Sequence, residues 1–304
     1  MMSPRIRRSL LYVPGWSEAM VRKAATRGAD TLILDLEDGV APEAKDRARD
    51  AVERFLQEVD FGSAEVLVRV NQPSSPWGGK DLDMLRRARP QGVLVPKIED
   101  PQTAASLDQE LGGATPLFLM IETVKGAALA APIAHSSPRV SGLVFGAADY
   151  RESLRAGRLD DEGELLFARF QILQAARMAG IEAFDTPWFE YRDTGGLRQS
   201  AWRVRQLGFE GKCAIHPVQV PIINQVFAPT RQEIERARSI FEAMAQAIGQ
   251  GRYVATVGDE MVEALHLKQA HRILDRAFRL GLANHPPPPV DIPGAWPRGP
   301  AERR

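Results

Sequence analysis

The sequence predicts an α/β protein built as a closed (β/α)8 TIM barrel, followed by a C-terminal helical extension. Strand-like apolar runs alternate with helical segments at intervals of roughly 25–30 residues, which is typical of a parallel sheet. Eight such units within about 220 residues match a barrel that closes on itself. An open doubly wound sheet is the alternative. It is less favoured because no G-x-G-x-x-G fingerprint follows the first strand.

The predicted strands are short, almost continuous apolar runs. A buried parallel strand has this pattern because both of its faces are covered. In chain order the eight runs are Ser9–Val13, Thr31–Leu36, Val66–Val70, Gly92–Val95, Leu117–Glu122, Val140–Phe145, Glu182–Asp185 and Lys212–Ile215.

The helix boundaries follow from capping and breaking residues. Ser17 suits an N-cap, Gly28 ends the first helix, and Pro42 suits the first turn of the second. The expected helices span residues 17–27, 42–59, 82–89, 101–111, 124–131, 162–179, 194–207, 231–248 and 261–280. We expect residues 150–161 to form a polar loop and residues 249–259 to connect the last two helices.

Three segments follow from this pattern. Residues 1–229 are expected to form the TIM-barrel catalytic domain. Residues 230–285 carry two helices that a barrel does not need, so we expect a lid or an oligomerisation segment. Residues 286–304 begin with a proline run and are expected to be extended and poorly ordered.

Composition argues against several classes of protein. The 304 residues contain 39 Lys+Arg and 39 Asp+Glu, whereas nucleic-acid-binding proteins usually show a basic excess. No apolar run approaches the ~18 residues of a membrane span. The single cysteine, Cys213, cannot form an intramolecular disulfide, which fits a cytoplasmic protein. We therefore expect neither a nucleic-acid nor a membrane partner.

Ionisable side chains end seven of the eight predicted strands. In a TIM barrel the C-terminal strand ends surround one opening, here called the mouth, where active sites lie. The polar residues at these ends are Asp35, Glu37, Asp38, Arg69, Asn71, Lys97, Glu122, Asp149, Asp185 and His216. A ring of neutralising salt bridges is the structural alternative. We favour a catalytic mouth, because buried charges so arranged also perturb pKa values and bind ligands.

Two of these carboxylates, Glu122 and Asp149, end successive apolar runs. They are expected to point into the same mouth and to hold one Mg²⁺ or Mn²⁺, since Mg²⁺ favours one or two carboxylates with water and substrate oxygens. For either residue alone, helix capping is an equal alternative. Asp35, Glu37 and Asp38 are expected to contact the water shell of the metal or the substrate.

The remaining polar and aromatic candidates have more than one interpretation. Arg69 is expected to face an anion, either a carboxylate or a developing enolate oxygen, through its paired donors. Lys97 either binds substrate or neutralises acids. His216 binds phosphate, acts in acid–base catalysis or is a hydrogen-bonded barrel histidine. Trp77 and Trp188 either wall the mouth or pack.

These residues lie in motifs that resemble the citrate lyase β-subunit family, which includes the malyl-CoA and citramalyl-CoA lyases of the HpcH/HpaI aldolase superfamily. The similar segments, in order, are RSLLYVPG (8–15), DLEDGV (35–40), VRVN (68–71), VPK (95–97), IET (121–123), FGAADY (145–150), AIHP (214–217) and VFAPT (226–230). The resemblance covers about residues 7–280. Each segment is short, but eight in the same order are specific.

The resemblance implies a homotrimeric TIM barrel that uses Mg²⁺ to cleave or form a C–C bond between an acyl-CoA and a 2-oxo acid. Carried over by position, Glu122 and Asp149 bind Mg²⁺, and Arg69 contacts the substrate and the enolate. Glu37 belongs to a pair of catalytic acids.

The second acid is implied to come from residues 258–264, often of a neighbouring subunit. Glu263 stands where many relatives have Asp, and Asp259 or Glu260 are alternatives. The chain also departs from its relatives at Leu154-Arg155, where they often have Leu-Gly, so the loop after the metal aspartate is expected to differ.

The implied activity is cleavage of a 3-hydroxyacyl-CoA, such as malyl-CoA or citramalyl-CoA, to acetyl-CoA and glyoxylate or pyruvate. One alternative is a citrate lyase β subunit that forms oxaloacetate within a complex. Others are a CoA-independent class II 2-oxo-acid aldolase and a catalytically weak CoA-binding protein. The helices after Thr230 favour the stand-alone lyase, because they can supply a lid.

Overall fold

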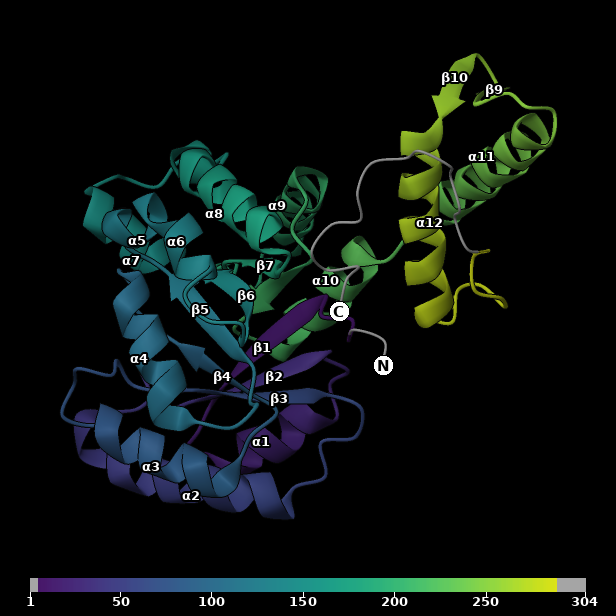
Figure 1. Cartoon of the computed structure of the whole chain (residues 1–304). Coiled ribbons are helices and arrows are strands. Elements are labelled where there is room, and N and C mark those ends of the chain that lie inside the picture. Colours follow the sequence, from purple (N-terminus) through teal and green to yellow (C-terminus); the bar gives the residue numbers. More distant parts are fainter. Residues whose placement is uncertain (1–4, 289–304) are drawn as a thin grey trace. The chain divides into compact units, whose positions relative to one another are not determined.

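The computed structural model describes residues 5–288 and contains a closed barrel of eight parallel strands (Figure 1). The strands are β1 (Ser9–Pro14), β2 (Thr31–Asp35), β3 (Glu65–Arg69), β4 (Gly92–Val95), β5 (Leu117–Ile121), β6 (Val140–Phe145), β7 (Glu182–Asp185) and β8 (Gly211–Ala214). Consecutive strands are neighbours, and β8 pairs with β1 through Lys212 and Ser9. The TIM-barrel prediction is confirmed.

Helices follow the strands around the barrel. They are α1 (Glu18–Ala25), α2 (Lys45–Glu58), α3 (Gly78–Ala88), α4 (Pro101–Leu111), α5 (Val124–Ala128), α6 (Ala130–Ala134), α7 (Ala147–Leu154), α8 (Leu166–Ala179), α9 (Thr194–Leu207) and α10 (Val220–Phe227), with 3-10 turns η1 (Pro42–Ala44), η2 (Gly163–Leu165) and η3 (Pro217–Gln219). Ser17 caps α1 as expected, accepting the Met20 N–H.

Several helices differ from the sequence-based expectations, because α3 begins at Gly78 and the expected helix 124–131 is divided into α5 and α6. The expected loop 150–161 was wrong at its start, because α7 continues through Tyr150 to Leu154. Helix α10 was not predicted at all. Its sequence VPIINQVF is mostly apolar, with Pro221 in the first turn, and only Asn224 and Gln225 mark the polar face of a surface helix.

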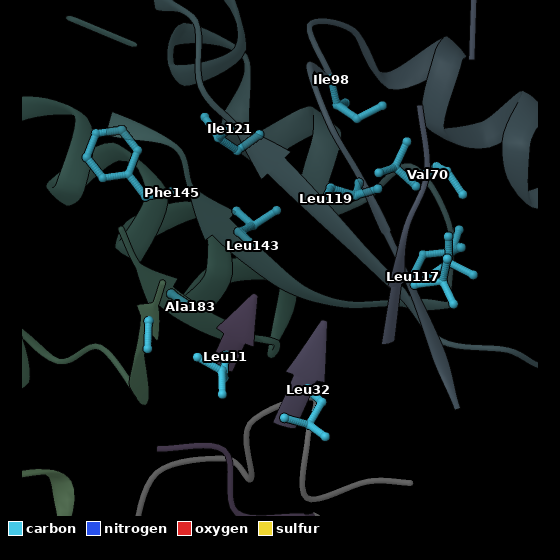
Figure 2. Packing of buried hydrophobic residues seen from close by; sticks show 14 of the residues in the cluster. Leu11, Leu32, Val70, Ile98, Leu117, Leu119, Ile121, Leu143, Phe145 and Ala183 are labelled. Carbon is cyan, nitrogen blue, oxygen red and sulfur yellow. The ribbon is translucent and has the colours of Figure 1, made fainter. Parts of the chain in front are cut away.

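Side chains on the strands alternate between the barrel interior and the surrounding helices. The interior cluster contains Leu10, Ile33, Leu67, Leu94, Phe118, Met120, Val144, Phe184 and Cys213. The outward residues pack against the helices, and Figure 2 shows this packing for Leu11, Leu119, Ile121, Leu143 and others. On β5, Phe118 and Met120 face inward, so Glu122 is in phase with the interior and lies at its C-terminal end.

A buried charge cluster closes the opposite, N-terminal end of the barrel. Arg7 forms ion pairs with Glu65 on β3 and Glu182 on β7, both at 2.5 Å, and its guanidinium lies 5.2 Å from the Phe118 ring centroid. Residues at this end of a TIM barrel contribute to stability, whereas catalytic residues lie at the opposite end. Catalytic residues are therefore expected at the mouth.

Asp185 does not face the mouth, so that expectation was wrong. Phe184 belongs to the interior cluster, and Asp185, one residue later, points outward. There it pairs with Lys212 Nζ at 2.5 Å and with Arg169 Nε of α8 at 2.8 Å. All three residues are at most 1% exposed, so the group is a structural ion-pair network between strand and helix.

The chain divides after Phe227 into two compact units, Arg7–Phe227 and the segment that begins at Ala228. The second contains α11 (Arg231–Gly249), the antiparallel hairpin β9 (Val254–Val257) and β10 (Glu260–Glu263), and α12 (Ala264–Arg279). Its helices enclose a small core of their own that includes Ile234, Met244, Val262, Leu267 and Leu274.

The expected last helix, 261–280, was wrong in its first turn. Met261–Glu263 lie in β10, and Gly258, with φ of 60°, forms the turn between the two strands. Residues 289–304 of the expected proline-rich tail lie outside the described part of the chain. Between residues 5 and 288, no helix is both long enough and apolar enough to cross a bilayer.

Candidate active site

Arg69 is held rigidly at the C-terminal end of β3. Its Nε and Nη2 donate to the two carboxylate oxygens of Asp35 on β2, each at 2.7 Å. The guanidinium also lies 4.9 Å from the centroid of the Tyr12 ring on β1, a cation–π contact. The fork and the ring together fix the plane of the guanidinium and leave its Nη1 edge for other anions.

Asp35 is fully used in supporting this arrangement. Besides the two Arg69 donors, its oxygens accept the backbone N–H groups of Glu37 and Gly39, both at 2.9 Å. Four hydrogen bonds fill a carboxylate. The expectation that Asp35 contacts the substrate or the metal shell is therefore wrong, and Asp35 instead shapes the loop that presents Glu37 and Asp38.

Glu37 lies between the two cations of the mouth. Its Oε2 is 2.9 Å from Arg69 Nη1, and its Oε1 accepts a hydrogen bond from Lys97 Nζ at 3.2 Å. Burial raises the pKa of Glu37 above its ordinary value, while Arg69 and Lys97 oppose that rise. Asp38 contacts the same Arg69 nitrogen at 3.3 Å, but its side chain is 61% exposed, so a ligand can displace it.

Lys45 supports the Glu37 loop from below. Its Nζ, at the start of α2, donates to the carbonyl oxygens of Leu36 at 2.8 Å and Glu37 at 2.7 Å. The ammonium also lies 5.2 Å from the Trp77 ring centroid. Trp77 therefore packs on a lysine, and the loop that carries Glu37 is anchored by its backbone as well as by Asp35.

Glu122 follows β5 directly and is only 1% exposed. Its Oε1 accepts the backbone N–H of Lys97 at 2.7 Å, and Lys97 adopts a left-handed conformation with φ of 54° to donate it. Such strain is found where a structure positions functional groups. Burial, and then the nearby charges of Glu37 and Asp149, raise the pKa of Glu122 to about 8.

Asp149 lies in the first turn of α7, and its charge contributes to the raised pKa of Glu122. No hydrogen bond or ion pair of its carboxylate is formed within residues 5–288. Gly146 brings the two loops together, because a Cβ there would lie 2.5 Å from both Cβ and Oε2 of Glu122. The carboxyl groups of Glu122 and Asp149 therefore lie close enough for their charges to interact.

These residues fit a hard divalent cation. The acids of the mouth outnumber its cations, Arg69 and Lys97, and both burial and the neighbouring acids Glu37 and Asp149 raise the pKa of Glu122. Among the described residues, no group of three or more Asp, Glu, His or Cys side chains is arranged to hold a metal. Two carboxylates with water and substrate oxygens are what Mg²⁺ accepts, so Glu122 and Asp149 would hold it.

The comparisons with known proteins agree with this chemistry. Residues 8–217 match the family described as HpcH/HpaI aldolase/citrate lyase, and residues 168–282 match a family described as C–C bond lyase of the TIM-barrel fold. The chain belongs to the HpcH/HpaI aldolase/citrate lyase family. It is a carbon–carbon bond lyase of that family.

Two curated relatives align with this lyase over almost their full length. The citrate lyase subunit beta of Escherichia coli (strain K12) is 39% identical over 288 residues, which cover 91% of this chain and 95% of the relative. The (3S)-malyl-CoA thioesterase of Cereibacter sphaeroides (strain ATCC 17029 / ATH 2.4.9) is 37% identical over 273 residues, which cover 89% and 94%.

Solved structures of similar lyases contain magnesium. The protein CitE from Mycobacterium tuberculosis, in complex with magnesium, acetoacetate and coenzyme A, is 28% identical with a TM-score of 0.78, and the match covers 89% of this chain and 98% of that one. The M. tuberculosis citrate lyase beta subunit complexed with oxaloacetate and magnesium is 29% identical, with a TM-score of 0.65 over 73% of this chain and 96% of that one.

His216 of the lyase lies at the start of the β8–α10 connection and is exposed. Its Nδ1 accepts the Val218 N–H at 3.2 Å, and its ring stacks on Tyr191 with centroids 4.6 Å apart. It is neither paired with a mouth carboxylate nor buried as a core histidine.

Glu263 belongs to the second unit, so its relation to the mouth remains a proposal. It is exposed at the N-cap of α12, and its N–H donates to His266 Nδ1 at 3.1 Å.

Several supporting residues escaped the sequence reasoning. Tyr12, Lys45, Gly146 and Gln219 all act through contacts with residues distant in sequence. Only Tyr12 and Gly146 had a sequence signal, because they lie in the segments RSLLYVPG and FGAADY.

Proposed function

We propose that this lyase cleaves a 3-hydroxyacyl-CoA, such as malyl-CoA or citramalyl-CoA, to acetyl-CoA and a 2-oxo acid, glyoxylate or pyruvate. The supporting observation is the mouth itself. Glu122 and Asp149 place two interacting carboxyl groups near an arginine that Asp35 and Tyr12 hold in one orientation. A retro-aldol (Claisen) cleavage needs both features, a cation site for the oxo acid and a fixed donor for the enolate.

The chain's own residues divide these tasks. Glu122 and Asp149 would hold Mg²⁺ or Mn²⁺, and the bound ion would supply Lewis acidity toward the oxygen atoms of the 2-oxo acid. The Nη1 edge of Arg69 stabilises the developing enolate oxygen as a preorganised donor. Lys97 and Asp38 orient the substrate, with Asp38 leaving Arg69 as the substrate anion arrives.

Glu37 is the proposed proton acceptor. Its raised pKa brings it closer to the working pH of a general base, and Arg69 and Lys97 keep it in place. In the cleavage direction one proton leaves the substrate hydroxyl and one is added to the enolate carbon. The two proton transfers balance, so a pair of carboxyl groups can serve both steps.

Glu263 is the proposed second acid. The C-terminal segment, 230–285, would act as a lid that brings this residue to the mouth, from a neighbouring chain if the protein is a homotrimer. Glu263→Gln should lower kcat by at least about 100-fold, within the range of general acid–base catalysis. Asp259→Asn, in the turn of the same hairpin, tests the alternative acid and should leave kcat unchanged. Normal turnover by the Glu263→Gln variant would refute the assignment.

The experiment that tests the proposed function is a substrate panel. Malyl-CoA, citramalyl-CoA, 3-hydroxy-3-methylglutaryl-CoA and citryl-CoA are incubated with the protein in Mg²⁺ and in EDTA, and the oxo-acid products, a 3-oxo acid from 3-hydroxy-3-methylglutaryl-CoA and 2-oxo acids from the others, are trapped with phenylhydrazine. We expect metal-dependent release from malyl-CoA or citramalyl-CoA, and its loss in Glu37→Gln. Release from none of the four would refute the proposal.

A second candidate is a citrate lyase β subunit that cleaves a citryl thioester to oxaloacetate within a complex. The 39% identity to the E. coli citrate lyase subunit beta favours it. The C-terminal helices do not favour the stand-alone form as expected, because that relative aligns over 91% of this chain. Co-purification with carrier and transferase subunits would support the complex. Turnover of a 2-hydroxy acid without any thioester would instead indicate a CoA-independent class II aldolase.

A further inference from the structure

A cavity of about 310 Å³ lies between α3 and α4, at the N-terminal ends of β4 and β5. The two helices are neighbours on the barrel (Figure 1). We call this space the α3–α4 cavity, and its lining includes Leu85, Arg89, Val93, Leu111, Ala114 and Thr115. Because the mouth lies at the C-terminal strand ends, the cavity is separate from the candidate active site.

Much of the lining of the α3–α4 cavity is apolar. Leu85 and Val93 are only 3% and 1% exposed, Pro90 is also buried, and Leu111 is half-buried. Hydrocarbon that enters such a space is removed from water, which is favourable. The volume is at the small end of the range for ligand pockets, so it fits a compact molecule.

Arg89 adds a positive charge to the cavity that no acid neutralises within residues 5–288. Three other arginines of this region are each paired with an acid, namely Arg86 with Asp83 at 2.5 Å, Arg87 with Glu53 at 2.7 Å and Arg139 with Asp108 at 2.9 Å. The Arg89 guanidinium forms neither an ion pair nor a hydrogen bond in the described part of the chain. The Thr115 hydroxyl group likewise has no hydrogen-bond partner there.

The backbone of Arg89 has a conformation that favours a different residue. Arg89 ends α3 in the left-handed region, with φ of 46°, and its N–H donates to the Leu85 carbonyl at 2.9 Å. Glycine is the usual residue at such a helix end, as Gly180 is after α8. Capping therefore explains the conformation but not the arginine, whose side chain brings strain that glycine would avoid.

The carbonyl groups at the end of α4 do not oppose an anion in the cavity. A free helix C-terminus would repel it, but cationic side chains already engage these carbonyls. Arg139 Nη1 donates to the carbonyl oxygen of Gly112 and, at 3.1 Å, to that of Gly113. Arg86 Nε donates to the Glu110 carbonyl at 2.9 Å. The same bonds hold the loop that forms one side of the cavity.

We propose that the α3–α4 cavity binds a small organic carboxylate with a hydrocarbon tail. Arg89 is the ion-pair partner of the carboxylate, and Thr115 offers a second hydrogen bond. The tail packs on Leu85, Val93 and Leu111. This site is additional to the proposed function and does not depend on it, because it shares no residue with the mouth.

The test is a ligand-observed NMR titration of the full chain in EDTA, with hexanoate as the probe. Hexan-1-ol lacks the charge and acetate lacks the tail, so we expect hexanoate to bind about tenfold or more tightly than either. Arg89→Gly should weaken hexanoate binding by roughly tenfold or more, the scale of a hydrogen bond to a charged group. It should not lower the unfolding temperature, because glycine relieves the left-handed strain.

Three further variants locate the binding site. Ala114→Phe, at an exposed position of the lining, fills the cavity and should abolish binding. Arg87→Gln removes a neighbouring arginine that does not line the cavity, and Arg69→Lys changes the mouth, so both should bind hexanoate as the wild type does.

Any of three results would overturn the inference. They are binding of hexan-1-ol or acetate as tight as that of hexanoate, unchanged hexanoate affinity in Arg89→Gly, and loss of hexanoate binding in Arg69→Lys. Thermal unfolding checks that each variant is folded, and if Ala114→Phe is not, Arg89→Gly decides. The readout is binding in the absence of metal, so a protein that cleaves no thioester of the panel can still support this site.

Discussion

Gly146→Ala tests whether the geometry of the Glu122 carboxylate controls metal binding. Gly146 separates β6 from α7, and its φ of −105° is accessible to alanine, so the substitution carries no left-handed strain. The added methyl group, however, would lie 2.5 Å from both Cβ and Oε2 of Glu122. The change therefore acts on one carboxylate and leaves every ionisable group in the chain.

The expected effect follows from the size of this overlap. Ordinary van der Waals contact begins at 3.4 Å, so the Glu122 side chain must move by about 0.9 Å. A metal site tolerates deviations of only about 0.2 Å in its ligand distances. Displacing one of two protein ligands should weaken Mg²⁺ binding by at least the 10–100-fold typical of a disturbed supporting shell. Metal-dependent activity should fall by a similar factor.

Mg²⁺ binding is measured by isothermal titration calorimetry, and kcat is measured with the substrate that the protein cleaves in the panel. Gly79→Ala is the matched control, because a Cβ there meets no atom within 4 Å. Urea unfolding shows whether the fold is intact. If Gly146→Ala binds Mg²⁺ with wild-type affinity, then Glu122 does not hold the metal or its loop yields freely, and the reasoning from this contact is refuted.

Three further predictions follow from the same contacts. Because the pKa of Glu122 is raised to about 8, protons compete with Mg²⁺ below that pH, and the apparent Kd for Mg²⁺ should rise by up to about tenfold per pH unit between pH 8 and 6. Mg²⁺ titrations at pH 8.5, 7.5 and 6.5 measure this rise, and Glu37→Gln should make the Kd less dependent on pH. A Kd that does not change with pH would contradict the prediction. Arg69→Lys loses the two parallel hydrogen bonds to Asp35 and should lower kcat by about 100-fold or more with little change in KM, as measured by steady-state kinetics. A wild-type kcat would exclude a role of Arg69 in stabilising the enolate. Asp185→Asn leaves the buried cations Lys212 and Arg169 without their carboxylate and should lower the free energy of unfolding by about 3–5 kcal/mol, as measured by urea unfolding. Glu18→Gln removes one partner of an exposed ion pair and should lower it by less than about 1 kcal/mol. Equal effects of the two substitutions would contradict the structural role of Asp185.

The barrel could be predicted from the sequence because its signal is local and repeated. Each strand is a short apolar run that ends at a polar residue, and the observed boundaries fall within one residue of the predicted ones, as for β5 (Leu117–Ile121). The hairpin β9–β10 was missed because both strands are short and mostly exposed, so their alternation does not separate them from a helix start.

The candidate site was predictable in its charges but not in their support. Residues in phase with an inward-facing strand, such as Glu122, could be placed from the strand pattern alone. The same alternation, counted from Phe184, would have directed Asp185 outward, so that error was avoidable. The contacts of Lys45 with the Leu36 and Glu37 carbonyls depend on a helix returning to a strand end, which a single sequence does not encode locally.

The inward-facing side chains differ in their chemistry from one side of the barrel wall to the other. On β2, β3 and β5 the row that faces the interior ends in charged groups at the mouth, whereas on β7 and β8 its members nearest the mouth in the interior cluster are Phe184 and Cys213, and Asp185 and Lys212 are turned outward into the ion-pair network. Near the mouth, the wall formed by β2, β3 and β5 therefore presents charged groups, whereas the wall formed by β7 and β8 presents uncharged side chains that affect the site only through their size. Substitutions in β7, β8 and the loops that follow them could therefore change which thioester fits, while the proposed catalytic residues stay unchanged.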